Sequence, residues 1–138
     1  MKRKLTAISL GITMCAAMVT AAFAQGDNTL KTYAGKTVIL YTGDVHGGIS
    51  GYAQLAALKE DLQEAGASVL LLDAGDYIRG REAVNLSAGE NAVKLMNRSG
   101  YDAAGLGRHE FDYGSTRLAE LEKDMQFSVL AADRKSVV

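Results

Sequence analysis

The sequence has no proline, one cysteine and two histidines among its 138 residues. The cysteine, Cys15, lies in the N-terminal segment, so the rest of the chain has no thiol with which to form a disulfide. The formal net charge of −1 gives no basic footprint for nucleic acid or for an anionic membrane surface. The hydrophobic fraction of 48% is typical of a globular protein, and the length suits about one small domain.

The first 24 residues have the layout of a secretory signal peptide. Three basic residues at positions 2–4 precede an uncharged stretch over residues 5–25, which contains the small-residue cleavage site Ala22-Phe23-Ala24. Two alternatives remain open, an uncleaved membrane anchor and a lipoprotein modified at Cys15. We expect cleavage after Ala24 and export to the periplasm or the cell exterior.

After a polar lead-in over residues 25–36, apolar runs alternate with helical patterns. Strands are predicted over residues 37–42, 68–72, 101–107 and 127–131, and helices over residues 52–65, 87–98 and 115–125. Continuous apolar strands joined by helices favour an α/β fold, β-α-β-α-β-α-β, with a parallel sheet covered on both faces.

Polar residues follow the predicted strands, at Asp44, His46, Asp76, His109 and Asp112. The carboxyl ends of parallel strands share one edge, where ligands bind, so these side chains are expected to meet there. Carboxylates and imidazoles gathered in one crevice suit a divalent metal such as Zn, Mn or Fe. Asp73 is interpreted as a structural turn residue rather than a ligand.

Three blocks of sequence resemble the motifs of one family. Residues 38–47 (VILYTGDVHG) are similar to the D-x-H-G block of calcineurin-like metallophosphoesterases, and residues 72–76 (LDAGD) to their G-D block. Residues 107–114 (GRHEFDYG) resemble the G-N-H-E-F-D-x-G block, whose E-F-D form indicates the 5′-nucleotidase branch. The resemblance implies that residues 37–132 are part of a domain whose full fold is a four-layer αββα sandwich.

The resemblance also implies roles for individual residues. Asp44 and His46 would bind the first of two divalent ions, and Asp76 would bridge both. His109 would protonate the leaving oxygen, and Asp112 would orient His109. Water activated by the metal would attack phosphate monoesters, most specifically nucleoside 5′-monophosphates or related nucleotides. No nucleic acid and no stable membrane partner are expected.

Arg108 is the main departure from the family pattern, which has an asparagine ligand there. Arginine has only donors and a fixed positive charge, so it cannot bind a metal. Either the second metal site is damaged and the guanidinium holds substrate phosphate, or Arg108 points away and another residue replaces the ligand. Gly43 also replaces an asparagine, at a less demanding position.

Further histidine ligands of the family, in a G-H and a G-H-x-H block, are not found in this chain. Residues 133–138 would be encoded by GATCGGAAGAGCGTCGTG, which matches the start of a common sequencing adapter, and are interpreted as a non-native tail. The 138-residue chain is therefore expected to be an inactive fragment of a hydrolase. The alternative is a non-catalytic nucleotide- or metal-binding relative with a degenerate site.

Overall fold

The structure, a computed structural model, describes residues 29–131. The predicted signal peptide, the first residues of the lead-in and the tail at 133–138 lie outside the described residues. Across residues 29–131, none of the helices combines the length and the apolar character that a membrane crossing requires.

Four parallel strands form a single sheet, as the sequence predicts. The strands are β1 (Thr37–Thr42), β2 (Ser68–Asp73), β3 (Ala103–Gly105) and β4 (Ser128–Leu130), and they lie in the order β1-β2-β3-β4. The third strand is shorter than predicted, because Ala103 and Ala104 alone pair with β2 and Gly105 pairs only with β4. The sheet thus ends early on the side where the polar residues follow.

The helices are α2 (Ser50–Glu64), α3 (Glu82–Asn85), α4 (Glu90–Ser99) and α5 (Ser115–Glu122), with short 3-10 helices η1 (Lys31–Tyr33) and η2 (His109–Phe111). The prediction of a helix over residues 87–98 is wrong in its first turn. Ala88 and Gly89 have positive φ, which interrupts the helix, so α4 begins only at Glu90. A side chain at position 89 would also approach Ile78, which explains the glycine.

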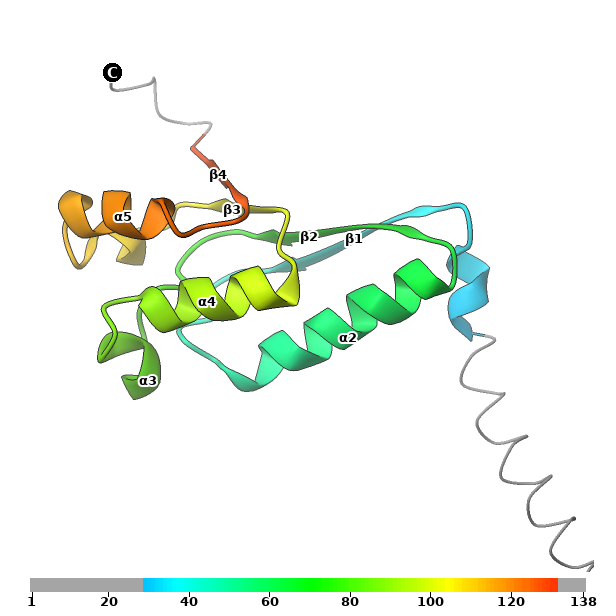
Figure 1. Cartoon of the computed structure of the whole chain (residues 1–138), viewed down its shortest axis with the longest axis horizontal. Coiled ribbons are helices and arrows are strands. Elements are labelled where there is room, and N and C mark those ends of the chain that lie inside the picture. The colour runs from blue at the N-terminus through cyan, green and yellow to red at the C-terminus, as the bar shows by residue number, and fades with distance from the viewer. Residues whose placement is uncertain (1–28, 132–138) are drawn as a thin grey trace, which may run out of the picture.

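The described residues cover only one face of the sheet, which corrects the prediction of helices on both faces. In Figure 1, α2 and α4 lie together on one side of β1 and β2. The opposite face leaves apolar side chains exposed, including Tyr41 at 80% and Ile39 at 58%. The core on the covered side consists of Tyr52, Leu71, Tyr77, Ile78, Val93, Met96, Tyr101, Ala104, Leu121 and Phe127.

The strand order explains this one-sided packing. Crossovers between parallel strands are right-handed, so helices change face only when the direction of strand addition reverses. Within residues 29–131 each new strand is added on the same side of the previous one, and the order never reverses. Successive crossovers therefore place their helices on the same face.

Candidate metal centre

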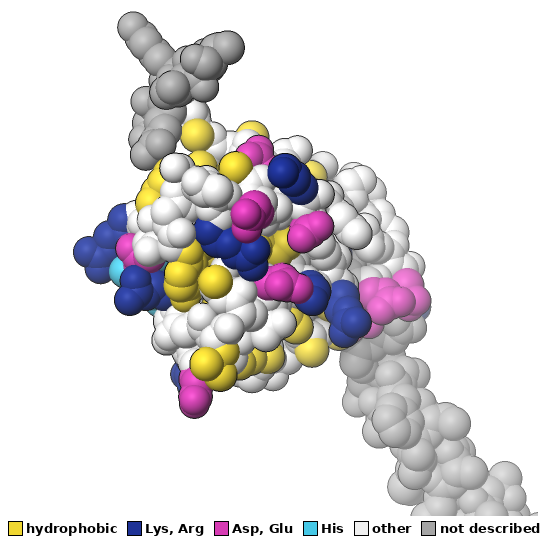
Figure 2. Space-filling view, turned by 60° about the vertical axis from the view of Figure 1, so that its left-hand side comes forward, with side chains coloured by type: hydrophobic (Ala, Val, Ile, Leu, Met, Phe, Trp, Pro, Cys, Tyr) yellow, Lys and Arg dark blue, Asp and Glu magenta, His cyan; other side chains and the backbone are white. Residues whose placement is uncertain are grey.

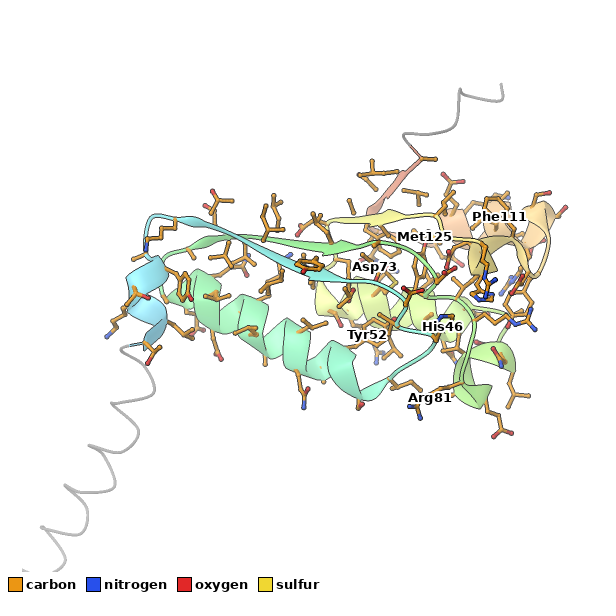
Figure 3. All side chains as sticks on the ribbon, turned by 180° about the vertical axis from the view of Figure 1, so that it is seen from behind. His46, Tyr52, Asp73, Arg81, Phe111 and Met125 are labelled. Atoms are coloured by element: carbon orange, nitrogen blue, oxygen red, sulfur yellow. The ribbon has the colours of Figure 1, made fainter. Side chains whose placement is uncertain are left out.

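Three loops meet at the carboxyl edge of the sheet. They are residues 43–49 after β1, residues 74–81 after β2 and residues 106–112 after β3. Figure 3 shows His46 beyond the end of β1, at the same end of the molecule as Asp73. The strand-end rule therefore predicted correctly that these loops meet.

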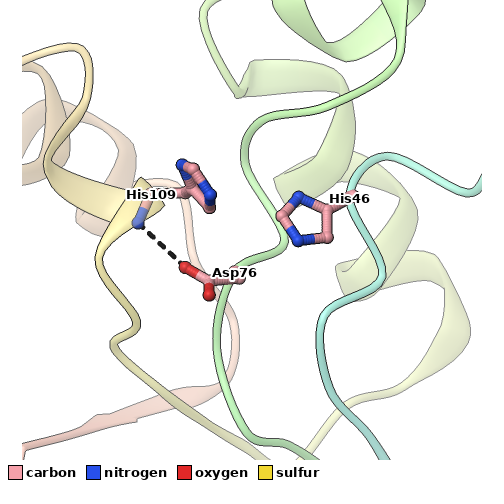
Figure 4. Close-up of side chains that lie close together, drawn as sticks. All are labelled: His46, Asp76 and His109. Atoms are coloured by element: carbon pink, nitrogen blue, oxygen red, sulfur yellow. Dashed lines mark hydrogen bonds between the residues drawn. The ribbon is translucent and has the colours of Figure 1, made fainter.

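His46, Asp76 and His109 form a compact group of possible metal ligands. Each offers one ligand atom, and these atoms lie within 4.8 Å of one another (Figure 4). The two imidazole rings are 5.0 Å apart between centroids and meet edge to face. Two ring nitrogens and one carboxylate oxygen suit Zn²⁺ or a similar ion, so these residues fit the metal that the sequence predicts.

Asp44 lies beside this group but does not belong to it. Its Oδ1 is 3.6 Å from Nε2 of His46, and its side chain is 79% exposed. Of the three residues predicted to bind metal, the structure therefore brings His46 and Asp76 together with His109, and it leaves Asp44 on the solvent side.

The predicted metal ligands have unusual backbone conformations. Asp44, His46 and Asp76 have φ values of 52°, 45° and 64°, in the left-handed region that residues other than glycine rarely adopt. Hydrogen bonds between loops hold them, since Asp44 N donates to Gly75 O and His46 N donates to Asp76 O, both at 3.1 Å. Strain of this kind concentrates at functional sites.

The loops after β2 and β3 are in direct backbone contact. Gly75 has a φ of +108°, and a Cβ atom there would lie 2.5 Å from the nitrogen of Gly107. This approach lets the backbone N–H of His109 donate to Oδ1 of Asp76 at 2.8 Å, drawn as the dashed line in Figure 4. Glycine at both positions thus allows Asp76 and His109 to share one site.

His109 has partners at both ring nitrogens. Nδ1 lies 2.6 Å from Oδ2 of Asp112, and Nε2 lies 3.2 Å from Nε of Arg108. Because Nε of arginine only donates, Nε2 of His109 accepts, and the ring proton is assigned to Nδ1, facing Asp112. The predicted pairing of His109 with Asp112 is thus present in the structure.

Asp112 also accepts a hydrogen bond from Arg79, whose Nη1 lies 2.7 Å from the same Oδ2. The hydrogen bond with His109, and then the hydrogen bond and charge of Arg79, lower the pKa of Asp112. The carboxylate is therefore stabilised in its charged form, which suits a group that orients an imidazole.

Asp73 turns into the protein, in agreement with its structural interpretation. Its Oδ1 accepts from Gly75 N at 2.8 Å, and its Oδ2 accepts from the hydroxyl of Thr42. Burial raises the pKa of Asp73, and the hydrogen bonds from Thr42 and Gly75 oppose that rise. This carboxylate shapes the turn that leads to Asp76.

Similarity to known proteins points to one family. The chain is 35% identical over 116 residues to a 5′-nucleotidase of Bos taurus, covering 71% of this chain and 20% of the relative. It is 36% identical over 140 residues to Protein UshA of Yersinia enterocolitica, covering 91% and 25%. The solved structure of a 5′-nucleotidase precursor from Thermus thermophilus superposes with a TM-score of 0.62 at 31% identity, covering 68% and 21%.

Over the residues that these proteins match, the chain belongs to the 5′-nucleotidase branch of the calcineurin-like metallophosphoesterases. The resemblance carried by the three sequence blocks is thereby confirmed, together with the α/β fold. The chain spans about a fifth of the length of the Bos taurus relative. No protein-family model matches the chain.

Two residues of this 5′-nucleotidase-type site escaped the sequence analysis. Arg79 binds Asp112, although its only signal in the sequence is a basic residue three positions after Asp76. Glu110 is fully buried, and its carboxylate accepts four backbone N–H groups. Its signal was its place in the E-F-D part of the block at residues 107–114, which names the branch but does not show that the side chain is buried.

Proposed function

We propose that a protein containing this chain hydrolyses phosphate monoesters in a metal-dependent reaction. The substrates that we propose are nucleoside 5′-monophosphates or related nucleotides. The supporting observation is the meeting of His46, Asp76 and His109 within 4.8 Å at the carboxyl edge of the sheet, in a homologue of 5′-nucleotidases. The N-terminal sequence pattern adds the proposal that this reaction takes place outside the cytoplasm.

His46 and Asp76, with Asp44 on the solvent side, are the residues that we propose to hold metal. Oδ1 of Asp76 is engaged by the amide of His109, so Oδ2 is the oxygen left to face an ion. Divalent ions bound there would supply the positive charge that activates water and offsets the charge of the phosphate.

His109 is proposed to protonate the leaving oxygen. In that role Nδ1 keeps its proton toward Asp112, and a second proton on Nε2 is passed to the substrate. The Nε–H of Arg108 now points at Nε2, so Arg108 must move before this nitrogen can donate. This contact supports the proposal that Arg108 impairs the site, and that the 138-residue chain is itself inactive.

A second candidate function is binding without turnover, and the contact between Arg108 and His109 favours it. A guanidinium beside the ligand group offers several N–H donors to a phosphate. In the space-filling view, basic side chains lie on either side of the visible histidine at the left edge, with an acidic side chain beside it (Figure 2). Such a relative would bind a nucleotide or one metal ion and release no phosphate.

Titration with Mn²⁺ and Zn²⁺ tests the metal site, and phosphate release from AMP tests the reaction. We expect the 138-residue chain to bind metal and to release no phosphate. A longer protein carrying this region is expected to hydrolyse AMP and to lose that activity on chelation. AMP binding without hydrolysis in the longer protein would favour the second candidate. Absence of metal binding by the chain would contradict the proposed metal site, and AMP hydrolysis by the longer protein that survives chelation would contradict the proposed reaction.

A further inference from the structure

Glu110 lies directly after His109 in η2, and its side chain has 0% relative exposure. Its Oε1 accepts from the backbone amides of Tyr77 at 2.8 Å and Ile78 at 3.3 Å. Its Oε2 accepts from Asp76 at 2.8 Å and Gly107 at 2.7 Å. Two carboxylate oxygens offer about four lone-pair sites, so the four amides fill the acceptor capacity of the side chain.

These four hydrogen bonds exclude Glu110 as a metal ligand. Both oxygens are occupied by backbone donors, and the carboxylate has no exposed surface through which an ion could reach it. A buried carboxylate without such partners would be costly, and four amide donors supply the compensation that a cation would otherwise provide. The charge of Glu110 is thus stabilised by backbone N–H groups of the two loops.

The amides that Glu110 binds are those of the site itself. Three of them belong to the segment Asp76, Tyr77 and Ile78 in the loop after β2, and the fourth belongs to the loop that carries His109. In the opposite direction, the carboxylate of Asp76 accepts the backbone N–H of His109. The loop after β2 therefore donates three backbone N–H groups to Glu110 of the other loop, and the loop after β3 donates one to Asp76.

We infer that Glu110 is a positioning residue, which fixes Asp76 in its left-handed conformation and so sets the spacing between the carboxylate of Asp76 and the ring of His109. Asp76 has a φ of 64°, and its amide is anchored by Glu110. Without that acceptor, Asp76 is free to relax toward an ordinary conformation, and its carboxylate turns away from His46 and His109. The metal role of Asp76 in this inference rests on the proposed function.

Two substitutions at Glu110 separate geometry from charge. Glu110→Gln turns one acceptor oxygen into an amide donor, which faces two backbone N–H groups and loses their bonds. Glu110→Asp keeps the charge and shortens the side chain by one methylene, so the carboxylate no longer reaches both loops. We expect both variants to weaken Mn²⁺ binding about 10–100-fold, the range seen when partners of metal ligands are removed.

Asp102→Asn is the matched control, at the residue directly before β3. The carboxylate of Asp102 also accepts a backbone N–H, from Leu71 at 2.7 Å, and pairs with Lys59 at 2.8 Å. This variant is expected to lower the melting temperature while changing Mn²⁺ affinity less than about twofold, because its bonds do not reach the site. Equal weakening in Asp102→Asn and Glu110→Gln would reduce the role of Glu110 to general stability and overturn the inference.

Amide hydrogen exchange on the unmodified chain provides a test that needs no variant to fold. The amides of Asp76, Tyr77, Ile78 and Gly107 are expected to exchange at least about tenfold more slowly than other loop amides. Fast exchange at these four positions overturns the inference, as does parental Mn²⁺ affinity in Glu110→Gln or full recovery in Glu110→Asp. If the unmodified chain binds no Mn²⁺, the proposed metal site fails instead, and the exchange rates still decide whether Glu110 holds the two loops.

Discussion

The two ends of the parallel sheet are held together in different ways. At the amino end of β3, Asp102 joins β2 to α2 through one hydrogen bond to Leu71 and one to Lys59. At the carboxyl end, the loops are bound to one another by the buried carboxylate of Glu110 and the partly buried one of Asp76, and three residues other than glycine adopt left-handed conformations. Backbone strain and dense polar bonding thus occur where side chains must be placed for chemistry, while ordinary packing suffices at the other end.

The largest effect is expected from Asp76→Asn at the carboxyl end. Replacing this carboxylate by an amide removes a charged ligand, while the amide oxygen can still accept from His109. We expect Mn²⁺ affinity to fall by about 100-fold or more with the fold retained, beyond the effect of removing an outer partner. Calorimetric titration measures this affinity. If Asp76→Asn binds Mn²⁺ as the parent does, Asp76 is not a ligand.

The second prediction compares one glycine from each end of the sheet. Gly75→Ala places a methyl group against the backbone of Gly107 at a φ of +108°, and we expect a loss of about 2 kcal/mol in stability. Gly35→Ala, before β1, meets no atom within 4 Å at a φ of +71°, and we expect a loss of about 1 kcal/mol. Chemical denaturation measures both. Equal losses would mean that the contact between the two loops adds nothing.

Arg108→Asn tests whether the arginine opposes metal binding at the carboxyl end. Removing a positive charge close to the ligand group is expected to tighten Mn²⁺ binding about tenfold, from the size of charge interactions near a protein surface. Arg98→Asn in α4 removes the same charge away from the site and serves as the control. In a longer, active protein, Arg108→Asn is also expected to increase AMP hydrolysis. No gain in metal binding or activity would show that Arg108 does no harm.

The smallest effect is expected from Asp112→Asn, in how far the melting temperature falls in acid. The pKa of Asp112 is lowered in the folded protein, so its contribution to stability is complete above the unfolded value of about 3.9. That contribution is lost as the pH falls through the lower, folded pKa. The melting temperature of Asp112→Asn should therefore decrease less than that of the parent between about pH 5 and pH 2. Asp124→Asn, with an exposed carboxylate, is the control and should follow the parent.

Much of the fold follows from the sequence, because its signals are local. The apolar runs that became β1 and β2 stand out against polar flanks, and the strand-end rule then places Asp44, His46, Asp76 and His109 at one edge. The turn at Ala88 and Gly89 was missed, since helical spacing continues through it. One-sided covering of the sheet was missed as well, because it depends on strand order, which no single segment encodes.

The particular hydrogen bonds between the loops could not be predicted from the sequence. The pairing of His109 with Asp112 was expected from the resemblance of residues 107–114 to the family block. Glu110 and Arg79 act on partners more than thirty positions away, at Asp76 and Asp112. Glutamate and arginine are usually exposed, and only the folded arrangement shows which of them is buried or bound.

The sequential strand order has a consequence for how the site forms during synthesis. Each pairing in the sheet joins strands that are neighbours along the chain, so no early strand waits for a distant one. Such local contacts favour fast assembly, and chains fold from the N-terminal side as they emerge. The segments that carry His46, Asp76 and His109 are therefore made before α5 and β4, with Glu110 the last of the loop-joining residues to arrive.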